Sequence, residues 1–330
     1  MKKGELTYVK FLRSQAATTL LLAAGLIVPW LVYSGWSQTP TIDQTGAIAT
    51  APTRYVADPT TRGVLNQLMM VGAFIGLWIM NRRYSVLRTN SVIYVGLAGL
   101  AFGSVPMLTG ASIGGALLAL TVVVGVLMMY SIYDRKAQTP RVFLLFFLLG
   151  CGSCGQYAFL VYAPVFLIAT AQMRCLTMRS LLAAIVGLIV PVWLLVGFGV
   201  IDLQEIRLPQ LGVVQPRRMI EMYPPSTLVC AGVAIVAGIW LTLVNIIKVY
   251  GFNARSRALN GVLSILTLIT AAMALVDWMR LGVYLPLLLC LMAMQATLYL
   301  RLNVDQRKGY LTFSTLILLY LCILIWNVVA

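Results

Sequence analysis

The chain has 330 residues, of which 61% are hydrophobic and only 10% are charged, and its formal net charge is +15. A soluble protein carries about a quarter charged residues, so this composition excludes a water-soluble globular protein and indicates that the chain is embedded in a bilayer. The basic residues form short clusters at the ends of apolar runs. This pattern favours membrane lipids as their partners and argues against nucleic-acid binding.

Eleven apolar segments are candidate membrane spans, since roughly 20 mostly apolar residues cross the hydrocarbon core. They lie near residues 15–35, 64–80, 91–108, 112–132, 142–154, 157–172, 181–200, 226–247, 259–276, 282–300 and 311–329. We therefore expect an all-α fold, a polytopic transmembrane helical bundle of about 11 spans that forms a single domain over residues 1–330. The first segment is too long for the apolar part of a signal peptide and lacks a small-x-small cleavage site, so we expect an uncleaved helix.

The distribution of lysine and arginine predicts the orientation of the bundle. If the N-terminus is cytoplasmic, the inner loops hold 18 of the 24 basic residues and the outer loops hold the other 6. Positive charge accumulates on the cytoplasmic side, so the sequence predicts an N-in, C-out topology in a bacterial inner membrane.

Residues 142–172 could cross the membrane once or twice. A single crossing would move most of the later basic residues to the outer side, so the charge pattern favours two crossings, with "GCGSCGQ" as the turn between them. This turn contains Cys151 and Cys154, whose spacing is compatible with small packing residues, a disulfide, or part of a metal site. The chain has no histidine and no second C-x-x-C, which favours packing.

Polar residues within the spans are few. Asn245 and Gln295 lie in the middle of two segments, where we expect them to bond between helices. Asp277 lies at the end of a span. Because no charged residue occupies a mid-span position, ion-coupled transport is disfavoured.

Two predicted outer loops, residues 36–63 and 201–225, are long enough to carry chemistry. A transferase that uses a polyprenyl-phosphate-linked donor needs a carboxylate as a general base and guanidinium groups that grip phosphate. The early acid, the long first outer loop and the N-in topology resemble the GT-C superfamily of membrane glycosyltransferases. The resemblance implies a catalytic role for Asp43 or, as the alternative, Asp58. Arg217, Arg218 and Arg207 are the candidate ligands of a lipid phosphate. Asp58 precedes Pro59, a pattern that also predicts a structural role at a helix start.

Three further segments carry a second resemblance: "LRTNSVIYVGLAGLAFGSVPML", "FLLFFLLGCGSCGQYAFLVYAPVFLIA" and "RSLLAAIVGLIVPVWLL". They are similar to a family of bacterial multi-pass membrane proteins grouped under a numbered domain of unknown function. That resemblance implies a polytopic fold and no particular activity, and the long first outer loop departs from it.

These observations leave three functions open. The first is a GT-C-like transferase that acts on a polyprenyl-phosphate-linked sugar or phosphate group at the outer face. The alternatives are a non-enzymatic scaffold or assembly factor of a cell-envelope complex, and a flippase-like carrier. We expect no cofactor and no metal. The expected partners are membrane lipids, including a polyprenyl-phosphate carrier.

Overall fold

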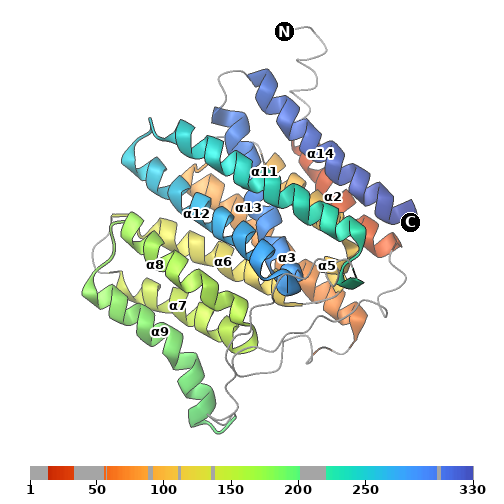
Figure 1. Cartoon of the computed structure of the whole chain (residues 1–330). Helices are drawn as coiled ribbons and strands as arrows, with labels where there is room; N and C mark the ends of the chain where they lie inside the picture. The colour runs from red at the N-terminus through yellow and green to blue at the C-terminus, as the bar shows by residue number, and fades with distance from the viewer. Residues whose placement is uncertain are drawn as a thin grey trace.

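The computed structural model describes residues 14–32, 56, 58–87, 92–110, 113–134, 138–200, 221–302 and 306–329. Throughout this part of the chain the backbone forms helices and short connections, without any β-strand (Figure 1). The helices are α2 (Gln15–Val32), α3 (Pro59–Tyr84), α4 (Ile93–Gly103), α5 (Pro106–Gly110), α6 (Ile113–Ser131), α7 (Thr139–Gly155), η3 (Tyr157–Val161), α8 (Tyr162–Gln172), α9 (Met178–Gly197), α11 (Pro225–Val249), α12 (Ala254–Val276), η5 (Trp278–Arg280), α13 (Leu281–Leu302) and α14 (Gln306–Val329).

Among the described helices, seven are long and apolar enough to cross a membrane, namely α3, α6, α9, α11, α12, α13 and α14. Helices α2, α4, α7 and α8 are apolar but shorter. The chain is therefore an all-helical protein of the multi-pass membrane type, as its composition predicts.

Two predicted boundaries were wrong. Helix α3 begins at Pro59, so the last residues of the predicted loop 36–63 are helical. A prediction based on apolar residues alone does not include this polar first turn. The turn is stabilised by the proline at its start and by the Asp58 cap. The segment 91–108 is not one helix, because α4 ends at Gly103 and Pro106 begins α5.

Helix α13 forms the centre of the bundle. It packs against α4, α6, α11, α12 and α14, and 94% of its apolar stretch is buried. Its sequence is apolar on every side, which is typical of a helix that other helices surround completely. The remaining elements are arranged around it, with α9 at one edge of the bundle and α14 at the opposite edge (Figure 1).

Small residues bring pairs of helices close together. Helix α9 packs closely along α7, and a Cβ atom added at Gly187 would lie 2.7 Å from the carbonyl oxygen of Phe143. In the opposite direction, a Cβ atom at Gly150 would lie 2.9 Å from the carbonyl oxygen of Leu188. Close approach through glycine is the usual way in which membrane helices gain packing contacts.

The segment from α7 to α8 is a hairpin. The backbone N–H of Asp134, just before α7, donates to the carbonyl oxygen of Met173, just after α8, at 3.1 Å. The segment therefore returns to the end of the bundle where it started, as the charge pattern predicts. The chain turns at Gln156, the last residue of the predicted turn "GCGSCGQ", whose backbone is extended; the six residues before it, "GCGSCG", form the end of α7. The glycines here approach α9 and the ring of Phe159 instead of bending the chain.

The two paired cysteines are free thiols in different environments. Cys154 is buried, and its Sγ donates to the carbonyl oxygen of Gly150 at 3.2 Å, whereas Cys151 is exposed. The packing role predicted for both residues therefore applies to Cys154 alone.

Asn245 and Gln295 bond between helices, as predicted. The Nδ2 of Asn245 in α11 donates to the backbone carbonyl and to the Oε1 of Gln295 in α13, each at 2.9 Å. The Nε2 of Gln295 in turn donates to the hydroxyl of Thr267 in α12 at 3.4 Å. This buried chain of polar groups links three neighbouring helices.

Candidate functional site

The sequence-predicted site is only partly within the described residues. Asp43, Arg207, Arg217 and Arg218 lie outside them, so their proposed roles stay predictions. Asp58 is described and caps α3: its Oδ2 accepts hydrogen bonds from the backbone N–H of Thr61 at 2.8 Å and from the Thr61 hydroxyl at 2.6 Å. The structural role predicted for Asp58 at a helix start is confirmed.

A buried ion pair occupies the break between α12 and α13. The Nη1 of Arg280 donates to the Oδ2 of Asp277 at 3.0 Å, and the hydroxyl of Tyr284 donates to the same oxygen at 3.4 Å. The guanidinium of Arg280 also lies over the ring of Tyr157, 5.9 Å from its centroid. Asp277 is only 1% exposed, so both charges are held away from water.

This cluster also holds buried polar atoms without a hydrogen-bond partner among the described residues. They are the Oδ1 of Asp277, the hydroxyl of Tyr157 and the Oε1 of the adjacent Gln156. Buried polar atoms usually have partners, so these three mark a place where water or a polar ligand group would be stabilised.

Hydrogen bonds gather several other helix ends around the same end of the bundle. The hydroxyl of Tyr223, two residues before α11, donates to the carbonyl oxygen of Met279 at 3.0 Å. The Nδ2 of Asn327, near the end of α14, donates to the carbonyl oxygen of Ser104, while its Oδ1 accepts from Ser226 at the start of α11; both distances are 2.8 Å. Burial raises the pKa of Tyr223 well above its usual value, so its phenol stays protonated as a donor.

A second polar site lies at the opposite end. Arg255 lies in the first turn of α12 and Asp277 follows its last residue, which places the two about 33 Å apart at 1.5 Å per residue, close to the thickness of a hydrocarbon core. At the Arg255 end, helices α3, α6, α7 and α12 enclose a pocket of about 690 Å³. Arg83, Arg141 and Arg255 line it, and we call it the arginine pocket.

Aromatic and hydroxyl side chains hold these arginines. The Nη1 of Arg141 donates to the Oγ of Ser131 at 2.8 Å and to its carbonyl oxygen at 3.3 Å. Arg255 lies over the ring of Tyr133, 5.8 Å from its centroid, and Arg83 lies 5.9 Å from the ring centroid of Tyr84. Each guanidinium is therefore positioned at a wall of the pocket without losing its charge.

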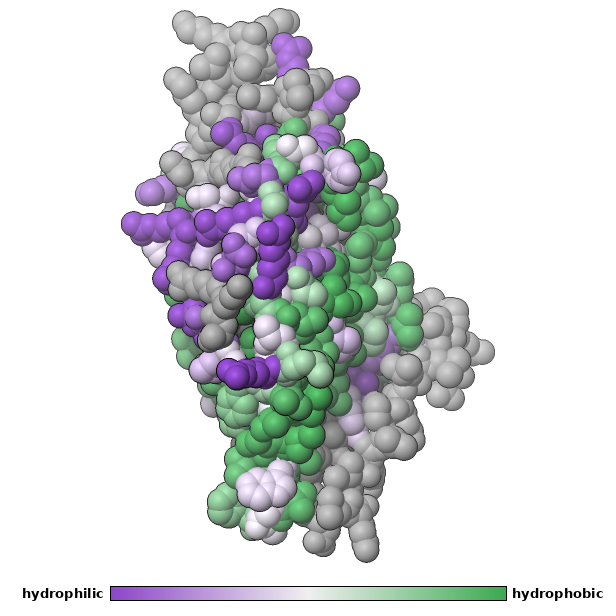
Figure 2. All heavy atoms as spheres, turned by 90° about the vertical axis from the view of Figure 1, so that its left-hand side faces the viewer, coloured by the Kyte–Doolittle hydropathy of each residue, from purple (hydrophilic) through white to green (hydrophobic). Residues whose placement is uncertain are grey.

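The pocket carries an excess of positive charge. Asp134 is the acid among its lining residues, and none of the three guanidinium groups is paired with a carboxylate of the described chain. Hydrophilic side chains gather on the face of the molecule that lies at the left of Figure 1, with hydrophobic surface beside them (Figure 2). Three arginines against one acid form an electrostatic environment that suits an anion.

Sequence reasoning assigned these arginines to membrane-surface clusters and missed the pocket. Arg83, Arg141 and Arg255 are far apart in the chain, and only the packing of four helices brings them together. A weak signal was available, since "RRY" at 82–84 and "YSIYD" at 130–134 place tyrosines beside basic helix ends.

In the described ranges, no group of three histidine, cysteine, aspartate or glutamate residues could hold a metal ion. No protein-family model matches the chain, and comparisons with curated proteins and with solved structures find no significant similarity.

Proposed function

We propose that this multi-pass membrane protein binds a phosphate-bearing anion in the arginine pocket. The observation that carries the proposal is the pocket itself, which combines a ligand-sized volume of about 690 Å³ with Arg83, Arg141 and Arg255. Guanidinium groups bind phosphate oxygens through paired, charge-assisted hydrogen bonds, which favours a phosphate over a simple carboxylate or halide.

The tyrosines and the acid complete the recognition. Tyr84 and Tyr133 orient two of the guanidinium groups and offer apolar ring faces to the organic part of a ligand. Asp134 projects from a left-handed backbone position at the end of α6 and can accept a hydrogen bond from a ligand hydroxyl or amine. The pocket therefore suits a phosphate group attached to a polar head, which can belong to a lipid or to a soluble compound.

The topology that we propose is N-in and C-out with eleven crossings of a bacterial inner membrane. It rests on the excess of lysine and arginine in alternate loops and requires the shorter helices α2, α4, α7 and α8 to complete the crossings. In this orientation the arginine pocket opens to the cytoplasm, and the Asp277–Arg280 pair lies at the outer face.

Binding is tested with pyrophosphate as a soluble probe on the purified full chain in neutral detergent. The unfolding midpoint should rise with pyrophosphate concentration, because a ligand that binds the folded state stabilises it. Replacing Arg255 with Gln removes a charge-assisted hydrogen bond, so we expect Arg255→Gln to weaken binding about 10- to 100-fold. A second experiment places the protein in nanodiscs that contain phosphatidylglycerol. Competition between this lipid and pyrophosphate would identify a lipid headgroup as a ligand of the pocket.

Arg257 provides the matched control. It lies on the same first turns of α12 but stacks on Tyr250, outside the pocket, at 5.9 Å from the ring centroid. Arg257→Gln should bind pyrophosphate like the wild type. Equal affinity in the wild type and Arg255→Gln would overturn the proposal and leave the scaffold function as the better account.

A second candidate is the GT-C-like transferase at the outer face. It is favoured by one observation: the predicted loop 36–63 leads into α3 and the predicted loop 201–225 leads into α11, and both helices begin at the end that holds Asp277 and Arg280. Bonds from Ser226 to Asn327, from Asn327 to Ser104, and from Asn66 to Thr109 connect these helix starts.

The proposed catalytic acid of that transferase is Asp43, with Arg217, Arg218 and Arg207 as phosphate ligands. Retention of a polyprenyl phosphate by the purified chain, followed by native mass spectrometry, should fall in Arg217→Ala and persist in Asp43→Asn, because a general base is needed for turnover and not for lipid binding. Equal retention in Arg217→Ala and the wild type would remove this candidate.

A further inference from the structure

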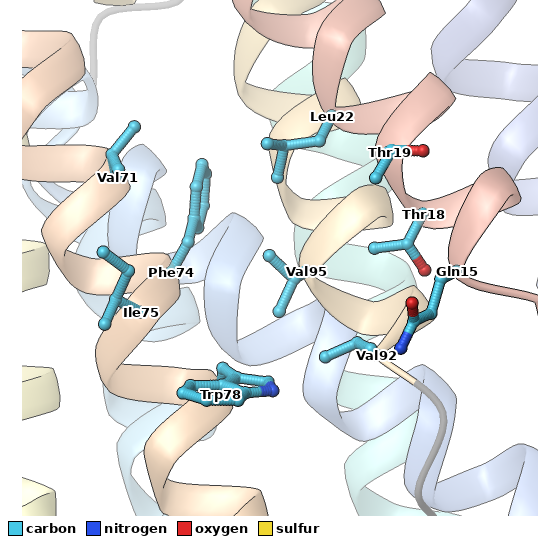
Figure 3. A pocket seen from close by; sticks show the side chains of 10 residues that line it. All are labelled: Gln15, Thr18, Thr19, Leu22, Val71, Phe74, Ile75, Trp78, Val92 and Val95. Atoms are coloured by element: carbon cyan, nitrogen blue, oxygen red, sulfur yellow. The ribbon is translucent and has the colours of Figure 1, made fainter.

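A second, apolar pocket lies on the other side of α3. It has a volume of about 320 Å³ and runs between α2, α3 and α4. Figure 3 shows Phe74, Ile75 and Trp78 of α3 on one side, Leu22 and neighbouring α2 residues on the other, and Val95 of α4 between them. We call this pocket the tail groove.

The tail groove is held in shape by hydrogen bonds to its walls. Beyond Leu22, the Nε2 of Gln67 donates to the carbonyl oxygen of Leu26 at 2.9 Å, which joins α3 to α2. Behind the groove, the hydroxyl of Tyr94 donates to the carbonyl oxygen of Leu77 at 3.4 Å, which joins α4 to α3. The three helices therefore keep a gap between them, and side chains of the described residues do not fill it.

The lining shows what the groove can hold. It is almost entirely apolar, and it stays open toward the surroundings through half-exposed Ile75 and Trp78. From Val71 to Trp78 it extends about 10 Å along α3, in the direction of the membrane normal for a spanning helix. An extended hydrocarbon chain matches this shape and chemistry, because it fills an apolar slot without any polar group to satisfy.

A positive charge lies at one mouth of the groove. Arg82 is one turn beyond Trp78 on α3, and its guanidinium lies over the indole ring at 5.1 Å from the centroid. Trp78, Val92 and Gln15 lie together at one end of the tail groove (Figure 3), and Arg82 follows Trp78 at that end. The sequence has no acidic residue between Asp58 and Asp134, so no acid of this stretch neutralises Arg82.

We propose that the tail groove holds one acyl chain of an anionic phospholipid whose phosphate is bound by Arg82. Trp78 then lies at the level where the acyl chain joins the headgroup, a position that tryptophan favours in membranes. The guanidinium is fixed over the indole and directed to the phosphate, while the excess of local positive charge selects an anionic lipid over a zwitterionic one. This lipid site is separate from the arginine pocket, which lies across α3 and uses Arg83.

The test uses the full chain in vesicles of equal phosphatidylglycerol and phosphatidylcholine, with excess pyrophosphate to occupy the arginine pocket, followed by extraction and native mass spectrometry of retained lipid. The wild type should retain one phosphatidylglycerol. Arg82→Gln should lower the preference for that lipid about fivefold, the effect of one basic residue beside an anionic headgroup. Thr19→Phe places a ring in the groove from its α2 wall, where Thr19 is exposed, and should abolish retention.

Arg83→Gln is the matched control, because Arg83 is the next residue on α3 but lines the arginine pocket. It should keep the bound lipid and lose pyrophosphate affinity, whereas Arg82→Gln should do the reverse. Each variant should therefore lose binding at one site and keep binding at the other. Retention of phosphatidylglycerol by Thr19→Phe at the wild-type level would overturn the tail groove as its site.

Trp78 gives a second measurement that does not depend on a groove-filling variant. The difference in fluorescence between the wild type and Trp78→Phe isolates the emission of this indole. Phosphatidylglycerol with brominated acyl chains should quench that emission strongly in a background of unlabelled phosphatidylcholine. Equal quenching by brominated phosphatidylcholine would contradict the selectivity for an anionic lipid.

Discussion

The side-chain amide of Asn245 bonds to both oxygens that Gln295 offers, its backbone carbonyl and its Oε1, each at 2.9 Å in the middle of the bundle. Replacing Asn245 with Ala leaves the Oε1 of Gln295 buried with one donor fewer, so we expect a loss of about 1–3 kcal/mol in unfolding free energy. A double-mutant cycle with Gln295→Ala should return a coupling energy of about 0.6 kcal/mol, the average for polar pairs in membranes. A coupling of zero would show that the two side chains act independently.

The Asp277–Arg280 pair is expected to be critical to the stability of the end of the bundle where α12 meets α13. Asp277→Ala leaves a buried guanidinium without its carboxylate, which costs about 3–5 kcal/mol for a pair of this kind. The double variant Asp277→Leu with Arg280→Met removes both charges and should be more stable than Asp277→Ala. Unfolding in a denaturing detergent compares the stability of the two variants. A double variant that is less stable than Asp277→Ala would contradict the expectation.

Asp58 is expected to act as a helix cap. The hydroxyl of Thr61 and then its backbone N–H donate to the Asp58 carboxylate and hold its pKa below the ordinary value of 3.8. A lowered pKa in the folded state contributes stability above pH 3.8, and this contribution is lost as the pH falls through the folded-state value.

The matched variants for this role are Asp58→Ser, which keeps a capping oxygen, and Asp58→Ala, which removes it. Thermal unfolding at neutral pH should rank the wild type and Asp58→Ser above Asp58→Ala. Loss of transferase activity in Asp58→Ser, without any loss of stability, would instead support the alternative catalytic role of Asp58.

The contact between α7 and α9 depends on Gly187. Its added Cβ atom would lie 2.7 Å from the carbonyl oxygen of Phe143 and 3.0 Å from the backbone nitrogen of Phe147, and backbone atoms cannot rotate away. We expect Gly187→Ala to cost about 1–3 kcal/mol through overpacking. Gly232 in α11 is the control, because nothing lies within 4 Å of an added Cβ atom there. Gly232→Ala should be neutral or stabilise the protein by up to about 1 kcal/mol.

The proposed topology predicts the position of the C-terminus. A reporter enzyme that is active only outside the cytoplasm should be active when it is fused after Ala330. A fluorescent protein that folds only in the cytoplasm should be dark at the same junction. Bright fluorescence there would overturn the odd number of crossings.

Most of the helical architecture could be predicted from the sequence, because a bilayer requires long apolar segments and helices satisfy their own backbone bonds. The interhelical role of Asn245 was accessible for the same reason, since an amide in an apolar segment must find a partner. The turn at Gln156 lies within the predicted "GCGSCGQ", but the helical conformation of the residues before it was not accessible. Glycines such as Gly150 serve either bends or close helix contacts, and the sequence does not distinguish the two uses.

The polar sites were harder to predict than the helices. Arg83, Arg141 and Arg255 carry no local motif, and their proximity depends on how four helices pack. The pairing of Asp277 with Arg280 is local, at three residues apart, but its burial depends on Tyr157 from a distant hairpin. Charge counts identify which end of a helix a basic residue occupies, and contacts between helices decide which basic residues share a pocket.

The central position of α13, with 94% of its apolar stretch buried, has a consequence for the synthesis of the protein. This helix emerges from the ribosome after α2 to α12, yet its neighbours include α4 and α6 from the first half of the chain. Until residues 281–302 are inserted, the surfaces that will contact α13 must face lipid or one another. The bundle therefore reaches its final packing only after residues 281–302 have been synthesised, and a chain that stops before α13 lacks its central helix.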